Sequence, residues 1–261
     1  MIPIRTALLA AVLLGGLSIS AAHATVITFA QYIEQRTSAG GNLQFTAGAS
    51  SANLHAYHQA VGDPVFFSFL GVAGLPADLL APQDALLRFN TGTGAATTAA
   101  AQSTVIPNSG TLLTQAFNQL FTISFIRTTD YVFHGVDYGT NLLTVSVAAA
   151  ASTPAIFTTA GSHAAAMSFD NTNYKVTFSS DFLTFQPGAA EDGSLSFSAA
   201  TPTFAKGTKF LRSFRADSTG TFDSDPVPVG TILPIPEPFS AALLGSGLLA
   251  VVLVRRRIKA E

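Results

Sequence analysis

The sequence contains no cysteine and no tryptophan, and it carries little charge. Without cysteine, the chain cannot form disulfides, thiolate zinc sites or a cysteine nucleophile. Charged residues make up 11% of its 261 residues, compared with roughly 25% in an average soluble protein. Phenylalanine, in contrast, occurs 21 times. A domain with this composition must therefore be stabilised by its apolar core alone.

Positive charge is scarce in the middle of the chain. Residues 25–235 include 8 Lys or Arg against 13 Asp or Glu, which gives a net charge near −5. Binding to nucleic acid depends on clustered basic residues that neutralise phosphates. We therefore expect no nucleic-acid partner.

Apolar and small residues fill the N-terminal segment 7–19, which follows the positive charge of Arg5. Ala22 and Ala24 flank a histidine in the small-x-small pattern that signal peptidase cleaves. We expect residues 1–24 to be a signal peptide, so that the mature chain begins at Thr25. A permanent N-terminal anchor is the alternative, but the apolar run is short for one.

A second uncharged apolar run lies at residues 239–254 (FSAALLGSGLLAVVLV). As a helix it would be about 24 Å long, a little less than the roughly 30 Å hydrocarbon core. Arg255, Arg256 and Arg257 follow at once, and positive charge in this position stays on the cytoplasmic side. The sequence therefore predicts one C-terminal transmembrane helix, with the main domain outside.

Pro236, Glu237 and Pro238 come directly before this apolar run. The order of Pro-Glu-Pro, apolar helix and arginine cluster closely resembles the PEP-CTERM sorting tail of Gram-negative bacteria. The resemblance covers about a tenth of the chain, residues 236–259. It implies recognition of the Pro-Glu-Pro by an exosortase, a membrane protease, and transient anchoring in the inner membrane. The alternative is an ordinary single-pass anchor that contains Pro-Glu-Pro by coincidence.

The resemblance and the composition together predict the domain organisation. The signal peptide is followed by an ectodomain over residues 25–222, a Pro-rich linker at 223–235 and the sorting tail at 236–261. In the tail, Arg255 to Arg257 are the retention signal that the resemblance implies.

Apolar residues of the ectodomain follow a period of two. Phe121, Ile123 and Phe125 alternate with Thr122 and Ser124, and similar runs occur elsewhere. This alternation is typical of antiparallel strands with one apolar and one wet face. Strands are therefore expected at 26–32, 42–47, 65–70, 121–125, 143–147, 174–179, 182–185, 194–198, 210–216 and 219–222. We predict an all-β ectodomain with an antiparallel β-sandwich or jelly-roll-like fold.

Three further segments are expected to form other structures. A short helix is expected from Pro82, with Leu79, Leu80, Leu86 and Leu87 turned inward. Residues 91–103 have low complexity and predict an exposed loop. A hairpin is expected over residues 130–147.

Few residue patterns indicate chemistry. His55 and His58 have the spacing of two metal ligands on a helix, but no third ligand lies near them in the sequence. Acidic residues at 191–192 and at 223–225 could ligate calcium, although solvated turns explain them better. No catalytic motif occurs, and we expect neither a metal nor another cofactor.

A polar and aromatic cluster occupies residues 130–138 (DYVFHGVDY). Tyr131, His134, Asp137 and Tyr138 are its candidate ligand residues, because sugar sites combine aromatic rings with hydrogen-bonding groups. The alternative is that the tyrosines cap a sheet.

Delivery signals at both ends and the missing catalytic motif favour a non-enzymatic structural protein of the cell surface or extracellular matrix. The alternative is a carbohydrate-binding module that acts on extracellular polysaccharide. A secreted hydrolase whose residues come together only in the fold is a third hypothesis.

Overall fold

The computed structural model describes residues 26–35, 40–90, 102–106, 110–117, 120–133, 135–150, 152 and 154–229. The expected signal peptide, the expected sorting motif and the apolar run 239–254 lie outside these residues. Among the residues that the structure does describe, none of the helices has the length and apolar character needed to span a bilayer.

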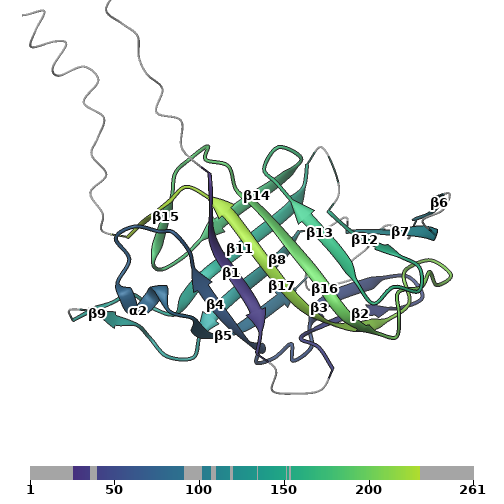
Figure 1. Ribbon diagram of the computed structural model, residues 1–261, viewed down its shortest axis with the longest axis horizontal. Coiled ribbons are helices and arrows are strands. Elements are labelled where there is room, and N and C mark those ends of the chain that lie inside the picture. The colour runs from purple at the N-terminus through teal and green to yellow at the C-terminus, as the bar shows by residue number, and fades with distance from the viewer. Residues whose placement is uncertain are drawn as a thin grey trace, which may run out of the picture. The chain divides into compact units, whose positions relative to one another are not determined.

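Fourteen strands form one antiparallel sheet, which is strongly curled into a half-barrel (Figure 1). The strands are β1 (Ile27–Glu34), β2 (Leu43–Ala47), β3 (Ala52–Ala56), β4 (Asp63–Phe69), β5 (Gln83–Asn90), β6 (Gln102–Ile106), β7 (Gly110–Ala116), β8 (Phe121–Arg127), β11 (Asn141–Ala149), β12 (Ala155–Thr159), β13 (Ala165–Phe169), β14 (Tyr174–Ser179), β16 (Asp192–Thr201) and β17 (Phe214–Ser224).

Two short ribbons and one turn of helix complete the described elements. The first ribbon pairs β9 (Val132–Phe133) with β10 (Val136–Asp137), and the second pairs β15 (Leu183–Phe185) with β18 (Pro226–Pro228). The helix is α2 (Ala77–Leu80).

The predicted all-β, antiparallel class is confirmed, but the strands are not divided between two separate sheets. From one edge, the order is β14-β11-β8-β5, and from the other edge it is β6-β7-β12-β13-β16-β17. Hydrogen bonding continues between β5 and β17 through further strands, so the two runs belong to one sheet. This sheet curls back on itself. The apolar faces of its two halves meet as two sheets of a sandwich would.

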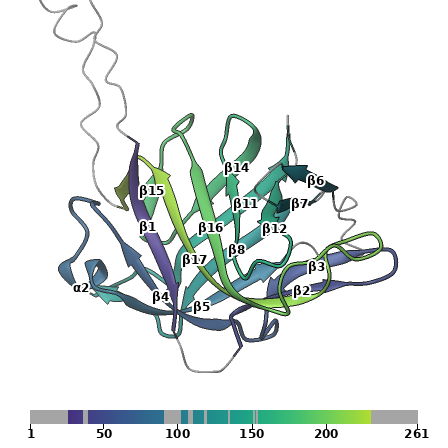
Figure 2. The ribbon, with the colours of Figure 1, turned by 45° about the vertical axis from the view of Figure 1, so that its right-hand side comes forward.

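Between β5 and β17 lie two strand pairs, β1–β4 and β2–β3. They are placed one after the other along the length of these strands. β1 pairs with residues 220–224 of β17, and its partner β4 pairs with residues 83–87 of β5. β2 pairs with residues 214–216 of β17, and its partner β3 meets β5 at Asn90. The two pairs meet at a place that we call the seam. It is formed by residues 32–34, 40–42, 57–63 and 215–219. Figure 2 shows the β2–β3 pair extending beyond the rest of the sheet.

Phenylalanine rings pack between the two halves of the curled sheet. The ring centroids of Phe125 and Phe222 lie 5.6 Å apart, those of Phe29 and Phe178 also 5.6 Å, and those of Phe121 and Phe169 5.9 Å. Burying each side chain contributes about 1.5–3 kcal/mol. These contacts join strands distant in sequence and substitute for the missing disulfides.

A glycine makes room for one of the aromatic rings. Gly220 lies in β17 beneath Tyr32, and a Cβ at this position would approach Tyr32 Cε1 to 2.6 Å. The same Cβ would lie 2.7 Å from Leu195 Cδ2, so a larger residue would force the packing around Tyr32 to shift.

The helix expected from Pro82 is wrong. Residues 83–90 form β5, and the single helical turn lies earlier, at Ala77–Leu80. Leu79 and Leu87 are buried, whereas Leu80 is 42% exposed. Ala85, Leu87 and Phe89 alternate inward, and pairing with β4 and β8 satisfies the backbone on both edges.

Other boundaries differ from the expectation. β11 pairs with β8 and β14, so residues 130–140 are an excursion between β8 and β11 and not one arm of a hairpin. Two of the expected strands, 210–216 and 219–222, meet in one strand that begins at Phe214. The first linker residues are also structured, because β17 includes Asp223 and β18 follows it. Residues 102–103, expected in a loop, begin β6.

We predict that Phe222→Ala destabilises the domain by about 3–5 kcal/mol, the usual cost of removing a buried ring. Phe222 is fully buried and contacts Tyr32, Phe125 and Phe178. The matched control is Phe157→Ala, since Phe157 is 44% exposed. Urea unfolding of the mature protein measures both, and an equal loss in the two variants would contradict the packing role of Phe222.

Candidate functional site

The predicted tyrosine cluster is part of the core and not an exposed platform. Tyr131 is 6% exposed, and its hydroxyl donates to both carboxylate oxygens of Asp78 at 2.8 Å. Burial, reinforced by the Asp78 carboxylate, raises the pKa of Tyr131 to about 12. The rings of Tyr131 and Tyr138 both pack on Phe182, at 5.7 and 6.2 Å between centroids. This packing favours the alternative to a sugar site, in which the tyrosines cap the sheet.

The polar members of the same cluster do not join the tyrosine rings in a site. Asp137 is exposed and accepts a hydrogen bond from the Gly139 amide at 2.8 Å, which closes a local turn. His134 lies outside the described residues.

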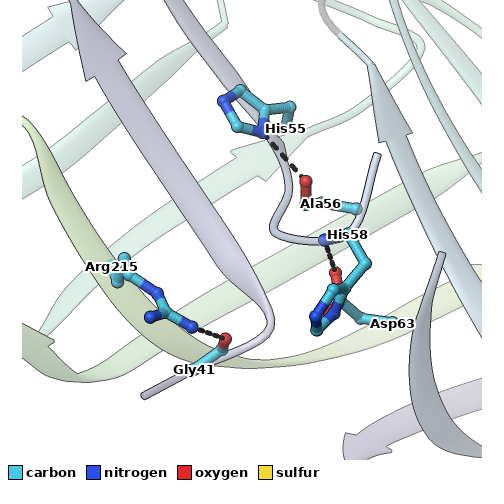
Figure 3. A network of polar contacts seen from close by, with 6 residues as sticks. All are labelled: Gly41, His55, Ala56, His58, Asp63 and Arg215. Atoms are coloured by element: carbon cyan, nitrogen blue, oxygen red, sulfur yellow. Dashed lines mark hydrogen bonds and ion pairs between the residues drawn. The ribbon is translucent and has the colours of Figure 1, made fainter. Parts of the chain in front are cut away.

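His55 and His58 have separate partners, as Figure 3 shows. His55 Nδ1 lies 2.8 Å from the Ala56 carbonyl oxygen, and its Nε2 lies 3.2 Å from Thr46 Oγ1. His58 lies after β3, where its Nδ1 is 2.6 Å from Asp63 Oδ1 and its amide donates to Asp63 Oδ2. Within the described part of the chain, no three His, Asp or Glu side chains are grouped to hold a metal ion.

The seam contains buried polar groups that hold the two strand pairs together. Tyr32 donates a hydrogen bond to Ser218 Oγ, which donates in turn to Asn42 Oδ1, each at 2.9 Å. The Arg215 guanidinium lies 3.4 Å from the ring centroid of Tyr57, a cation–π geometry. Burial raises the pKa of Tyr32, so its hydroxyl remains a donor. These contacts have a structural role.

Two of the acidic residues considered for calcium, Asp192 and Asp223, lie in strands, whereas Glu191 and Asp225 lie outside them. Asp192 and Asp223 are directly opposite each other in β16 and β17, and Asp223 accepts a hydrogen bond from Thr28. Burial raises the pKa of Glu191 and of Asp192, and the charges of Asp170 and Asp223 add to the rise at Asp192. Solvated turns were expected at both places, but at Asp192 and Asp223 the structure has two opposed carboxylates in neighbouring strands.

The structure also brings together four basic residues that no motif in the sequence predicts as a site. Lys206, Lys209, Arg212 and Arg215 follow each other at intervals of three, and they are half of the basic residues in 25–235. Residues 205–212, which we call the basic hairpin, form a tight turn closed by bonds from the Gly207 amide to the Phe210 carbonyl and from the Arg212 amide to the Ala205 carbonyl. Phe210 and Leu211 anchor it in the core.

A hollow of about 500 Å³ lies between the basic hairpin and the β2–β3 turn. It is lined by Ala47, Gly48, Ala49 and residues 207–213. The Ala47 amide donates to Ser213 Oγ at 2.9 Å, which joins the two walls. Figures 1 and 2 show the β2–β3 turn and the chain before β17 side by side. This volume is within the range of small-molecule sites.

The charges at this hollow lack counter-charges. Lys206, Lys209 and Arg212 are exposed, and Lys209 and Arg212 line the hollow. Among the described residues, no ion pair joins Lys206, Lys209 or Arg212 to a carboxylate. The hollow is therefore a local positive site on a domain that is acidic as a whole. The interval of three between basic residues was the signal in the sequence that could have identified it.

A second hollow, of about 310 Å³, lies on the outer face of β1 and β4. Its lining residues are Gln31, Ile33, Phe66, Ser68 and Pro82, none of which is charged. The hollow beside the basic hairpin is the stronger candidate, because it combines concavity with charge.

Comparisons of the chain with models of protein families, with curated proteins and with solved structures gave no match.

We predict that Asp192→Asn stabilises the domain near neutral pH. A carboxyl whose pKa is raised on folding favours the native state while it is protonated, and this contribution is lost as pH rises through the raised pKa. The midpoint of thermal unfolding should thus exceed that of the wild type at about pH 7, and the difference should vanish below the ordinary aspartate pKa of about 3.9. The control is Asp84→Asn, at an exposed position of β5, with little change expected. A gain that persists at acid pH would contradict the electrostatic cause.

Proposed function

We propose that this chain is a non-enzymatic structural protein of the cell surface or extracellular matrix, exported with a signal peptide and sorted by an exosortase. The observation that carries the proposal is the order of the tail: Pro236-Glu237-Pro238, the apolar run 239–254 and Arg255 to Arg257. An apolar helix over 239–254 holds the protein transiently in the inner membrane until processing.

The architecture between the two signals supports this proposal. The described strands begin at Ile27, three residues after the expected cleavage site, and end at Pro228, a few residues before the Pro-Glu-Pro. The phenylalanine core needs no disulfide, which suits a domain that folds after export without cysteine. The outer faces of the strands carry small hydroxylated residues, such as Ser194, Ser196 and Ser198, that suit a hydrated matrix.

A second candidate function is binding of extracellular polysaccharide. The hollow beside the basic hairpin favours it, because its lining offers Thr208 and Ser213 hydroxyls together with the cations of Lys209 and Arg212. Sugar sites commonly combine such groups in a shallow depression. This function is compatible with the first, since a matrix protein needs an attachment to the matrix polymer.

The sorting proposal is tested by intact mass spectrometry of the protein recovered from its host's surface and medium. We expect a mature chain that starts at Thr25 and ends near Pro236 to Pro238. We expect the Glu237→Ala variant to keep residues 239–261 and to stay in the membrane fraction, because the exosortase recognition element is altered.

The matched control is Pro234→Ala, which changes a nearby proline outside the Pro-Glu-Pro and should be processed like the wild type. A wild-type protein that still carries residues 239–261 would show an ordinary single-pass membrane protein and would refute the sorting proposal.

A further inference from the structure

We propose that the hollow beside the basic hairpin binds a segment of an anionic, carboxylate-bearing polysaccharide. This inference deepens the second candidate function, because it names the ligand class and the residues that recognise it. Lys209 and Arg212 face the hollow, and Lys206 extends the positive charge along the same hairpin.

The cations at the hollow are not neutralised by carboxylates of the described residues, and Lys209 Nζ lies 5.1 Å from the ring centroid of Phe210, a weak contact that an external anion can add to. Within the described residues, no carboxylate lies within ion-pair distance of Lys206, Lys209 or Arg212. Arg215, the fourth cation of the series, is instead held over Tyr57 and close to the Gly41 carbonyl oxygen. Three unpaired cations on an acidic domain keep a local positive potential, and an arginine can bind a carboxylate through two parallel hydrogen bonds.

The walls of the hollow suit a sugar chain better than a nucleic acid. Small residues give the hollow a low rim that a polymer can approach: Ala47, Gly48, Ala49 and Gly207. The lining also offers the hydroxyls of Thr208 and Ser213. Single-stranded nucleic acid requires aromatic rings on which bases stack. The one aromatic residue in the lining, Phe210, is 2% exposed and belongs to the core.

The position of the hairpin is fixed before any ligand binds. Phe210 and Leu211 are buried, the Leu211 amide donates to Gln115 Oε1 at 3.0 Å, and Ser213 is joined to Ala47. The backbone that carries Lys209 and Arg212 is thus tied to β7 and to β2. A preformed site of this kind loses less entropy on binding.

The test measures binding of the full chain, purified in detergent, to a polyuronate such as polygalacturonate, to neutral dextran and to single-stranded DNA. We expect binding to polyuronate that weakens with salt, and no binding to dextran. The double variant Lys209→Gln/Arg212→Gln should weaken polyuronate binding by about tenfold or more, which corresponds to at least about 1.4 kcal/mol.

The matched control is Arg88→Gln/Lys175→Gln, which removes the same charge at exposed positions outside the hollow lining and should weaken binding less than about twofold. An equal loss in the two double variants would show non-specific attraction and overturn the site. Equal affinity for dextran, or tighter binding to DNA, would overturn the ligand class. The sorting proposal is tested by the mature termini of the protein and this inference by binding of polyuronate. A protein that does not bind polyuronate can still have the expected termini, so the two proposals can fail separately.

Discussion

Contact between phenylalanine rings across the two halves of one curled sheet is the interaction on which the rest of the structure depends. With no cysteine in the chain, no covalent link holds β8, β11 and β14 against β1, β16 and β17. Phe125, Phe178 and Phe222 form that link through van der Waals contact and edge-to-face geometry. The curl of the sheet follows from this contact, because it lets the apolar faces of the two halves bury each other.

The curl also determines where polar groups can serve a function. The strand pairs β1–β4 and β2–β3 meet at the seam, where hydrogen bonds join Tyr32 to Ser218 and Ser218 to Asn42 in the interior. The β2–β3 pair then extends outward beside the basic hairpin, and the hollow lies between them. The domain thus has a hydrogen-bonded polar network inside and presents three of its cations close together beside the hollow.

Much of the strand pattern could be predicted from the sequence, because one face of each strand is phenylalanine or a branched aliphatic residue and the other is serine or threonine. The continuity of β17 could not be predicted in this way. Ser218 and Gly220 face the core, and their burial depends on Tyr32, which lies 186 residues from Ser218 in the sequence. The apolar pair Leu86-Leu87 fits a helix as well as a strand, and only pairing with β4 and β8 decides between them.

The candidate site was harder to predict than the fold, for two physical reasons. Tyr131 and Tyr138 look like a sugar platform in sequence, but their proximity does not reveal that both rings pack against Phe182. The basic hairpin was overlooked because a net charge summed over the domain hides a local cluster. Its interval of three marks the cluster, but the hollow exists only because the β2–β3 turn, over 150 residues earlier, lies against it.

The proposal places the β domain outside the cell. This claim can be tested by treating intact host cells with an amine-reactive label that cannot cross membranes, followed by peptide mass spectrometry. Lys206 and Lys209 are exposed and bear no ion pair in the described structure, so both should be labelled while a cytosolic control protein stays unlabelled. Labelling of these lysines only after the cells are broken would contradict the claim and place the domain inside.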